Sequence, residues 1–140
     1  MRPRIQIAFD AADPHALARF WAAALRYDVE DHTEVVSRLL SAGLLRDDEV
    51  LVDGDRRAFA DVATCTDPTS AGPRLFFQRV PEPKSAKNRV HLDLQVGEEA
   101  APGEVERLVE LGASVAWTTA DRGPVTVTLR DPEGNELCVS

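Results

Sequence analysis

The chain opens with apolar residues that alternate with polar or small ones. In RIQIAF, residues 4–9, the two isoleucines and the phenylalanine share one side, which predicts a half-buried strand. The period then becomes that of a helix, for which Asp13 suits the N-cap and Pro14 the first position. One stripe of this helix is apolar and consists of Leu17, Phe20, Trp21, Ala24 and Leu25. We expect the helix to pack on the strand, with Trp21 in the core.

The rest of the first half predicts a shorter helix and further strands. Residues 34–45 have a helical pattern that Gly43 ends, and Asp53-Gly54 is a hairpin signal between two strand-like runs. A turn that begins at residue 67 then leads into another strand. The two faces of that strand carry Leu75 with Phe77 and Phe76 with Gln78.

The same order of elements then occurs a second time. Residues 89–96 alternate as the first strand does, and residues 103–113 have the pattern of an amphipathic helix. Two strand-like runs, a turn and a closing strand complete the chain from residue 114 to residue 140. Aligning the two halves pairs Gln6 with His91 and Phe9 with Leu94.

This repetition predicts an α+β fold made of two βαβββ modules in tandem. The modules span residues 1–81 and 89–140, and we expect them to form a single domain. Residues 82–88 have no apolar periodicity, which indicates a connection over the surface.

Composition and charge limit the classes of partner. The chain has 140 residues, 44% of them hydrophobic, which suits one globular domain with a sizeable core. The net charge is -8 and the lysines and arginines are scattered, so no face is suited to nucleic acid. The apolar stretch at the start is too short for a signal peptide or a membrane span. Cys65 and Cys138 lack a CxxC spacing. We expect a cytoplasmic protein with two reduced thiols and no nucleic-acid or membrane partner.

Three stretches resemble one known family: FDAADPHALARFWAAAL, RLFFQRVPEPKSAKNRVHLDLQV and DPEGNELCV. With the repeated module, they make the chain similar to the glyoxalase-like branch of the vicinal oxygen chelate superfamily. That superfamily includes glyoxalase I, extradiol dioxygenases, and fosfomycin and bleomycin resistance proteins. The resemblance implies curved mixed sheets around a cleft. It also implies a homodimer, because superfamily members commonly pair modules across a dimer.

The resemblance places one face of each sheet in the cleft. The residues of this face are Gln6, Ala8, Phe76, Gln78, His91, Asp93, Gln95, Glu136 and Cys138. Metal-dependent members of the superfamily hold an ion there with residues of the first and last strands of each module. Carried over, the first-strand positions are Gln6 and His91, which can both bind a metal.

The last-strand positions break the family pattern. They fall on Cys138 and on Phe76 or Gln78, where the superfamily usually has a glutamate. Glu136 faces the same side as Cys138, but a ligand role would need a distorted strand or another register. We therefore expect no certain cofactor, with Gln6, His91 and Cys138 as the candidate ligands of a divalent ion such as zinc.

The candidate catalytic residues also have structural interpretations. Asp93 could orient the His91 imidazole or act as a base, or it could pair with Arg89 or Lys87. Cys138 could be a nucleophile, although a small buried apolar role is the simpler expectation. The full catalytic set is His91, Asp93 and Glu136. The candidate ligand-binding set is Gln6, Phe76, Gln78, His91, Trp117 and Cys138.

Two neighbouring features are open in the same way. Trp117 could cap the core or lie along the cleft as a stacking platform. The basic residues Lys84, Lys87 and Arg89 could approach an anionic ligand, but a solvated cluster is the simpler interpretation.

The sequence leaves three functions open. The first is a glyoxalase-like protein that binds a small organic molecule between its two modules without a complete metal site. The second is a divalent-metal-dependent lyase, isomerase or dioxygenase acting on a small carbonyl or aromatic substrate. The third is a structural or regulatory domain whose cleft is filled by its own side chains.

Overall fold

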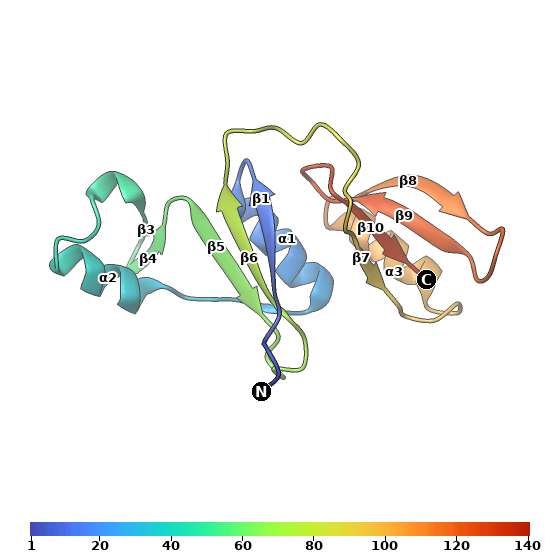
Figure 1. Ribbon diagram of the computed structural model, residues 1–140, viewed down its shortest axis with the longest axis horizontal. Helices are drawn as coiled ribbons and strands as arrows, with labels where there is room; N and C mark the ends of the chain where they lie inside the picture. Colours follow the sequence, from blue (N-terminus) through green and yellow to red (C-terminus); the bar gives the residue numbers. More distant parts are fainter. The chain divides into compact units, whose positions relative to one another are not determined.

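The β-strands form two four-stranded sheets and one separate two-stranded sheet. A computed structural model describes residues 1–140, and its contacts divide the chain into unit 1, Met1–Pro81, and unit 2, Glu82–Ser140. Each unit has its own four-stranded sheet and helix (Figure 1). No helix has both the length and the apolar character that crossing a membrane requires.

Unit 1 contains the first βαβββ module and an inserted segment, residues 33–59. Its elements are β1 (Gln6–Ala11), α1 (Pro14–Leu25), β2 (Asp28–Val29), α2 (Thr33–Ser41), a 3-10 turn (Asp47–Glu49), β3 (Val50–Asp53), β4 (Arg56–Phe59), β5 (Val62–Thr66) and β6 (Arg74–Arg79). The sheet order is β1-β6-β5-β2, with β1 parallel to β6 and the other pairs antiparallel.

Helix α1 packs on β5 and β6 and buries the apolar face of the sheet. Its N-cap is Asp13, whose carboxylate accepts hydrogen bonds from the backbone N–H groups of His15 and Ala16, as the sequence predicts. The Phe9 ring lies 5.1 Å from Phe77 and 5.2 Å from Trp21, centroid to centroid. Trp21 is therefore a core residue, as expected.

The strands predicted around Asp53-Gly54 are not part of the four-stranded sheet of unit 1. The hairpin at Asp53-Gly54 is present, but its strands β3 and β4 pair only with each other. The second strand of the βαβββ module in chain order is instead β2, which is two residues long and pairs with β5. Such a short strand has no alternation to detect, and its pairing with a distant strand defines it.

Unit 2 contains the second module without an insertion. Its elements are β7 (Leu92–Leu94), α3 (Ala101–Glu110), β8 (Ser114–Thr119), β9 (Thr126–Arg130) and β10 (Glu136–Val139). The order β7-β10-β9-β8, with β7 parallel to β10, repeats the order of unit 1. The strand expected over residues 89–96 is shorter than predicted, because β7 begins at Leu92 and ends at Leu94.

The predicted α+β fold of two tandem βαβββ modules is thus confirmed. The segment 82–88 belongs to unit 2, where Lys84 Nζ and the Asn88 backbone N–H donate to the carboxylate of Glu136. The segment therefore packs on β10 by hydrogen bonds to a buried side chain, as well as connecting the modules.

Candidate functional site

One face of the unit 2 sheet carries a row of polar, thiol and aromatic side chains. Leu92, Leu137 and Leu129 are register partners on the face that contacts α3, and the alternate residues point to the other face. There Cys138 pairs with Asp93 on β7 and with Thr128 on β9, and Thr128 pairs with Trp117 on β8. The row Asp93, Cys138, Thr128 and Trp117 therefore crosses all four strands.

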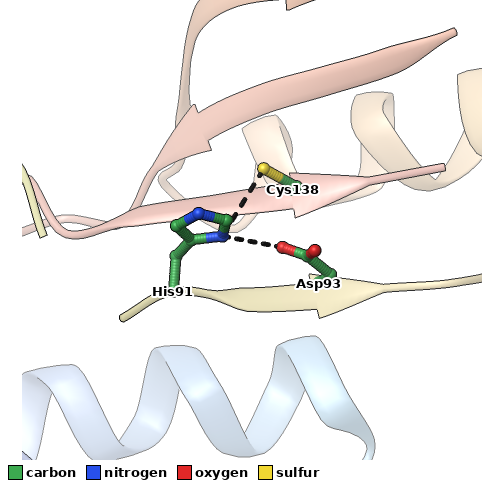
Figure 2. A group of neighbouring side chains, drawn as sticks. All are labelled: His91, Asp93 and Cys138. Atoms are coloured by element: carbon green, nitrogen blue, oxygen red, sulfur yellow. Dashed lines mark hydrogen bonds and ion pairs between the residues drawn. The ribbon is translucent and has the colours of Figure 1, made fainter. Parts of the chain in front are cut away.

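His91 joins this row from the residue just before β7. Its Nδ1 lies 2.8 Å from Asp93 Oδ1 and 3.9 Å from Cys138 Sγ. Figure 2 shows the Nδ1 edge of the ring turned toward both partners, with Nε2 pointing away from them. Because a carboxylate accepts, Nδ1 carries the proton toward Asp93, and the neutral ring leaves Nε2 as an acceptor. Of the expected partners of Asp93, it is His91 that contacts its carboxylate, and not Arg89 or Lys87.

The Cys138 thiol is held in its protonated form. Burial raises its pKa, and the negative charge of Asp93 acts in the same direction. The Thr128 hydroxyl, 3.5 Å from Sγ, opposes the rise but does not outweigh it. A neutral thiol is a poor nucleophile, so the geometry does not favour covalent catalysis by Cys138.

Glu136 does not belong to the cluster of His91, Asp93 and Cys138. Its side chain is 5% exposed and bonds to Lys84, Asn88 and Arg130. Burial opposes its ionisation, but the hydrogen bonds from Asn88 and Lys84 prevail and lower its pKa. Glu136 is thus a charged group that holds the segment before β7 in place.

Trp117 lies at the edge strand β8 and is 39% exposed. The guanidinium carbon of Arg130 lies 5.9 Å from the centre of its ring. Trp117 therefore does not cap the core, and its ring adds a flat apolar surface to the row that contains Cys138.

The corresponding face of unit 1 is chemically different. Arg74, the first residue of β6, donates from Nη1 to Gln6 Oε1 at 2.7 Å and from Nε to Glu30 Oε2 at 2.8 Å. Phe76 occupies the middle of the face, with Ala8 and Thr64 as its register partners. The Gln78 amide donates to Asp10 at 2.8 Å.

Sequence reasoning missed Arg74, Glu30, Thr64 and Thr128 as members of these faces. Thr64 is buried, donates to Glu30 and lies 3.1 Å from His32 Nε2, while Arg74 neutralises Glu30. The alternation of β6 could have assigned Arg74 to the face of Phe76. Glu30 follows β2, whose pattern is too short to predict any face.

The side chains present do not fit the hard metal site that the resemblance implies. A cation at Gln6 would meet the Arg74 guanidinium, which donates to the side-chain oxygen of Gln6. Unit 2 supplies one nitrogen, one oxygen and one sulfur, from His91, Asp93 and Cys138, with the ligand atoms within 4.8 Å of one another. This mixed set suits zinc better than manganese or magnesium.

Comparison with solved structures supports the fold assignment. A glyoxalase/bleomycin resistance protein/dioxygenase family enzyme from Burkholderia phytofirmans PsJN is 13% identical, with a TM-score of 0.65, over 96% of this chain and 94% of that one. The fosfomycin resistance protein FosX from Listeria monocytogenes, a mutant complexed with Mn(II) and a dihydroxypropylphosphonic acid, is 10% identical. Its TM-score is 0.62, and the match covers 99% of this chain and 89% of that one.

A protein described as a possible glyoxalase from Bacillus cereus is 16% identical, with a TM-score of 0.61, over 99% of this chain and 98% of that one. A comparison with curated proteins gives no match. At these identities the structures establish the shared fold only. The sequence itself matches the family model for a glyoxalase-like domain over residues 6–140. The chain therefore belongs to the glyoxalase-like domain family, and it has the fold of the glyoxalase/bleomycin resistance protein/dioxygenase structures.

Proposed function

We propose that this glyoxalase-like protein binds a small organic molecule on the polar face of the unit 2 sheet, without a complete metal site. The observation that carries the proposal is the row Asp93, Cys138, Thr128 and Trp117, joined by His91. It combines fixed polar groups with an accessible aromatic ring, which is the usual make-up of a ligand site. The arginine on Gln6 argues against a metal ion there, and the neutral thiol of Cys138 argues against a covalent mechanism.

The geometry also suggests the chemistry of the ligand. Asp93 accepts a hydrogen bond from the Nδ1–H group of His91. In the neutral ring, Nε2 is therefore a hydrogen-bond acceptor. A ligand would therefore present a hydroxyl or N–H group to His91. Trp117 favours a flat apolar part that stacks on its exposed surface.

Thermal shift measurements on a library of flat, hydroxyl-bearing or amide-bearing compounds test this proposal. A bound compound raises the melting temperature by mass action. We expect that rise to be lost in His91→Ala and in Trp117→Ala. It should persist in Val90→Ala, a matched control beside His91 whose side chain is 80% exposed. Hits that raise the melting temperature equally in all three variants would contradict the proposal.

A second candidate function, a metal-dependent lyase, isomerase or dioxygenase, is favoured by the close approach of the three ligand atoms. His91, Asp93 and Cys138 would hold the ion, which would polarise a substrate carbonyl. The FosX relative contains Mn(II), but that ion prefers oxygen ligands. This candidate therefore requires a softer ion such as zinc.

Elemental analysis before and after chelation separates the two candidates. One equivalent of zinc in the purified protein, lost in both His91→Ala and Cys138→Ala, would establish a metal site and favour the metal-dependent function. A metal-free protein that stays folded and binds compounds through His91 would support the metal-free site. Gln6→Ala should change neither result, because Arg74 already engages the Gln6 side chain.

A cytoplasmic homodimer completes the proposal. Both cysteines are free thiols, which suits a reducing compartment. The edge strand β8 exposes Val115, with 53% of its surface accessible, beside Trp117. An unpaired apolar edge is typically covered in an assembly. Light scattering at micromolar concentration tests the dimer, and a monomer there would contradict it.

A further inference from the structure

The inserted segment of unit 1 encloses a pocket that unit 2 lacks. The pocket has a volume of about 490 Å³, within the usual range for small-molecule sites. Its walls come from α1, the residues around β2, the β3–β4 hairpin and β5. It lies entirely within unit 1, so the pocket is independent of the His91 face of unit 2.

Several hydrogen bonds fix the walls of this pocket. His15 Nε2 on α1 lies 2.9 Å from the carbonyl oxygen of Phe59 and ties the helix to the end of β4. The Arg57 backbone N–H donates to Thr33 Oγ1 at 2.9 Å, and Arg57 Nη1 donates to Ser37 Oγ at 3.0 Å. These contacts join the hairpin to α1 and α2. A site formed in advance loses little conformational entropy when it binds a ligand.

Three guanidinium groups line the pocket, and none of them is in an ion pair. Arg19 lies on α1, and Arg56 and Arg57 lie on β4, whereas Arg46, Arg74, Arg107 and Arg130 are in ion pairs elsewhere. The acidic lining residues are Asp31, Asp53 and Glu30, and Glu30 is already neutralised by Arg74 at 2.5 Å. Arg57 donates to Ser37, so Arg19 and Arg56 are the two guanidinium groups that remain to attract an anion in a chain of net charge -8.

The pocket also exposes apolar side chains. Val29 is 48% exposed and Leu51 is 45% exposed, and both line it. Covering them with an apolar group would remove hydrocarbon surface from water. Asp31 and Asp53 line the pocket as well and oppose an anion, so a variant that neutralises Asp53 should bind an anion more strongly.

From these features we infer that the pocket binds a small organic carboxylate, with the carboxylate at Arg19 and Arg56 and an apolar body against Val29 and Leu51. An Arg guanidinium matches a carboxylate with two parallel hydrogen bonds. This site goes beyond the proposed function, because it uses different residues, a different unit and a charged ligand.

NMR titration of the full chain with 3-phenylpropionate and with its neutral amide tests the inference. We expect saturable shifts of pocket residues with the acid, and affinity weaker by about tenfold or more with the amide. Arg19→Gln and Arg56→Gln should each weaken binding of the acid by about tenfold, a typical loss for one charged hydrogen bond. Arg38→Gln, on α2 outside the pocket, is the matched control and should have no effect.

Asp53→Asn removes the opposing charge and should strengthen binding of the acid. This gain keeps the test decisive even where an arginine variant is poorly folded. Trp117→Ala should leave the titration unchanged, which separates this site from the proposed function. Equal affinity for acid and amide, or binding that is insensitive to Arg19, Arg56 and Asp53, would overturn the inference.

Discussion

Phe76 and Cys138 occupy equivalent positions in the two units. Phe76 on β6 pairs with Ala8 on β1 and Thr64 on β5, and Cys138 on β10 pairs with Asp93 on β7 and Thr128 on β9. The threonine is retained, while Ala8 and Phe76 give unit 1 an apolar centre where unit 2 has Asp93 and Cys138. One repeated backbone thus carries two different chemistries, which directs the proposed function to unit 2.

The two cysteines should differ sharply in reactivity. Burial raises the pKa of Cys65 to about 12, so at pH 8 only Cys138 should be alkylated by iodoacetamide. Asp93→Asn removes a charge that raises the pKa of Cys138 and should speed its alkylation. Thr128→Val removes a hydrogen bond that lowers that pKa and should slow it. Mass spectrometry of time points measures both rates, and equal labelling of Cys65 and Cys138 would contradict the assignment.

The two adjacent phenylalanines of β6 should have unequal effects on stability. Phe77 is fully buried and stacks on Phe9, so Phe77→Ala should lower the free energy of unfolding by about 3–5 kcal/mol. Phe76 lies on the opposite, half-buried face, and Phe76→Ala should cost about 1 kcal/mol. Urea denaturation measures both. A larger loss for Phe76→Ala would mean that the two faces are assigned wrongly.

The alternation of apolar residues was sufficient to predict β1, the faces of β6 and the repeated module. It could not predict β2, whose two residues are defined by hydrogen bonds to β5. Nor could it show that β3 and β4 pair apart from the main sheet, since a hairpin signal fixes a turn and not its neighbours. Local pattern thus predicted the elements, and long-range pairing decided their arrangement.

The candidate site was predictable to a similar extent. His91 and Asp93 are two residues apart, which placed them on one face of a strand. The sequence nevertheless left Arg89 and Lys87 open as alternative partners of Asp93. The contact between Gln6 and Arg74 joins residues 68 positions apart and depends on the parallel register of β1 and β6. It gives the Gln6 side chain a cationic partner, which the residue type alone could not indicate.

Gly72 is expected to resist substitution because of its neighbour Tyr27. A Cβ atom at Gly72 would lie 1.9 Å from the Tyr27 hydroxyl oxygen. Gly72→Ala should therefore lower the free energy of unfolding by about 1–3 kcal/mol. Gly103→Ala is the control, since nothing lies within 4 Å of its Cβ position and the helix α3 should be favoured. Urea denaturation compares the two, and Tyr27→Phe should recover part of the loss in Gly72→Ala.

Acid should destabilise unit 1 through Glu30. Burial opposes the ionisation of Glu30, but hydrogen bonds from Arg74 and Thr64 lower its pKa below the ordinary value of 4.5. The unfolded chain therefore binds the proton at a higher pH than the folded one. The stabilisation is complete above about pH 4.5 and is lost as the pH falls through the folded pKa.

Glu30→Gln tests this acid effect. The variant should be less stable than the parent at pH 7, and its free energy of unfolding should fall less steeply below pH 4.5. Urea denaturation followed by tryptophan fluorescence in a Trp117→Phe background measures it, because Trp21 in unit 1 is then the only tryptophan. Glu98→Gln, on an exposed turn of unit 2, should leave the pH dependence unchanged. An equally steep fall in Glu30→Gln would show that another carboxylate governs the acid sensitivity of unit 1.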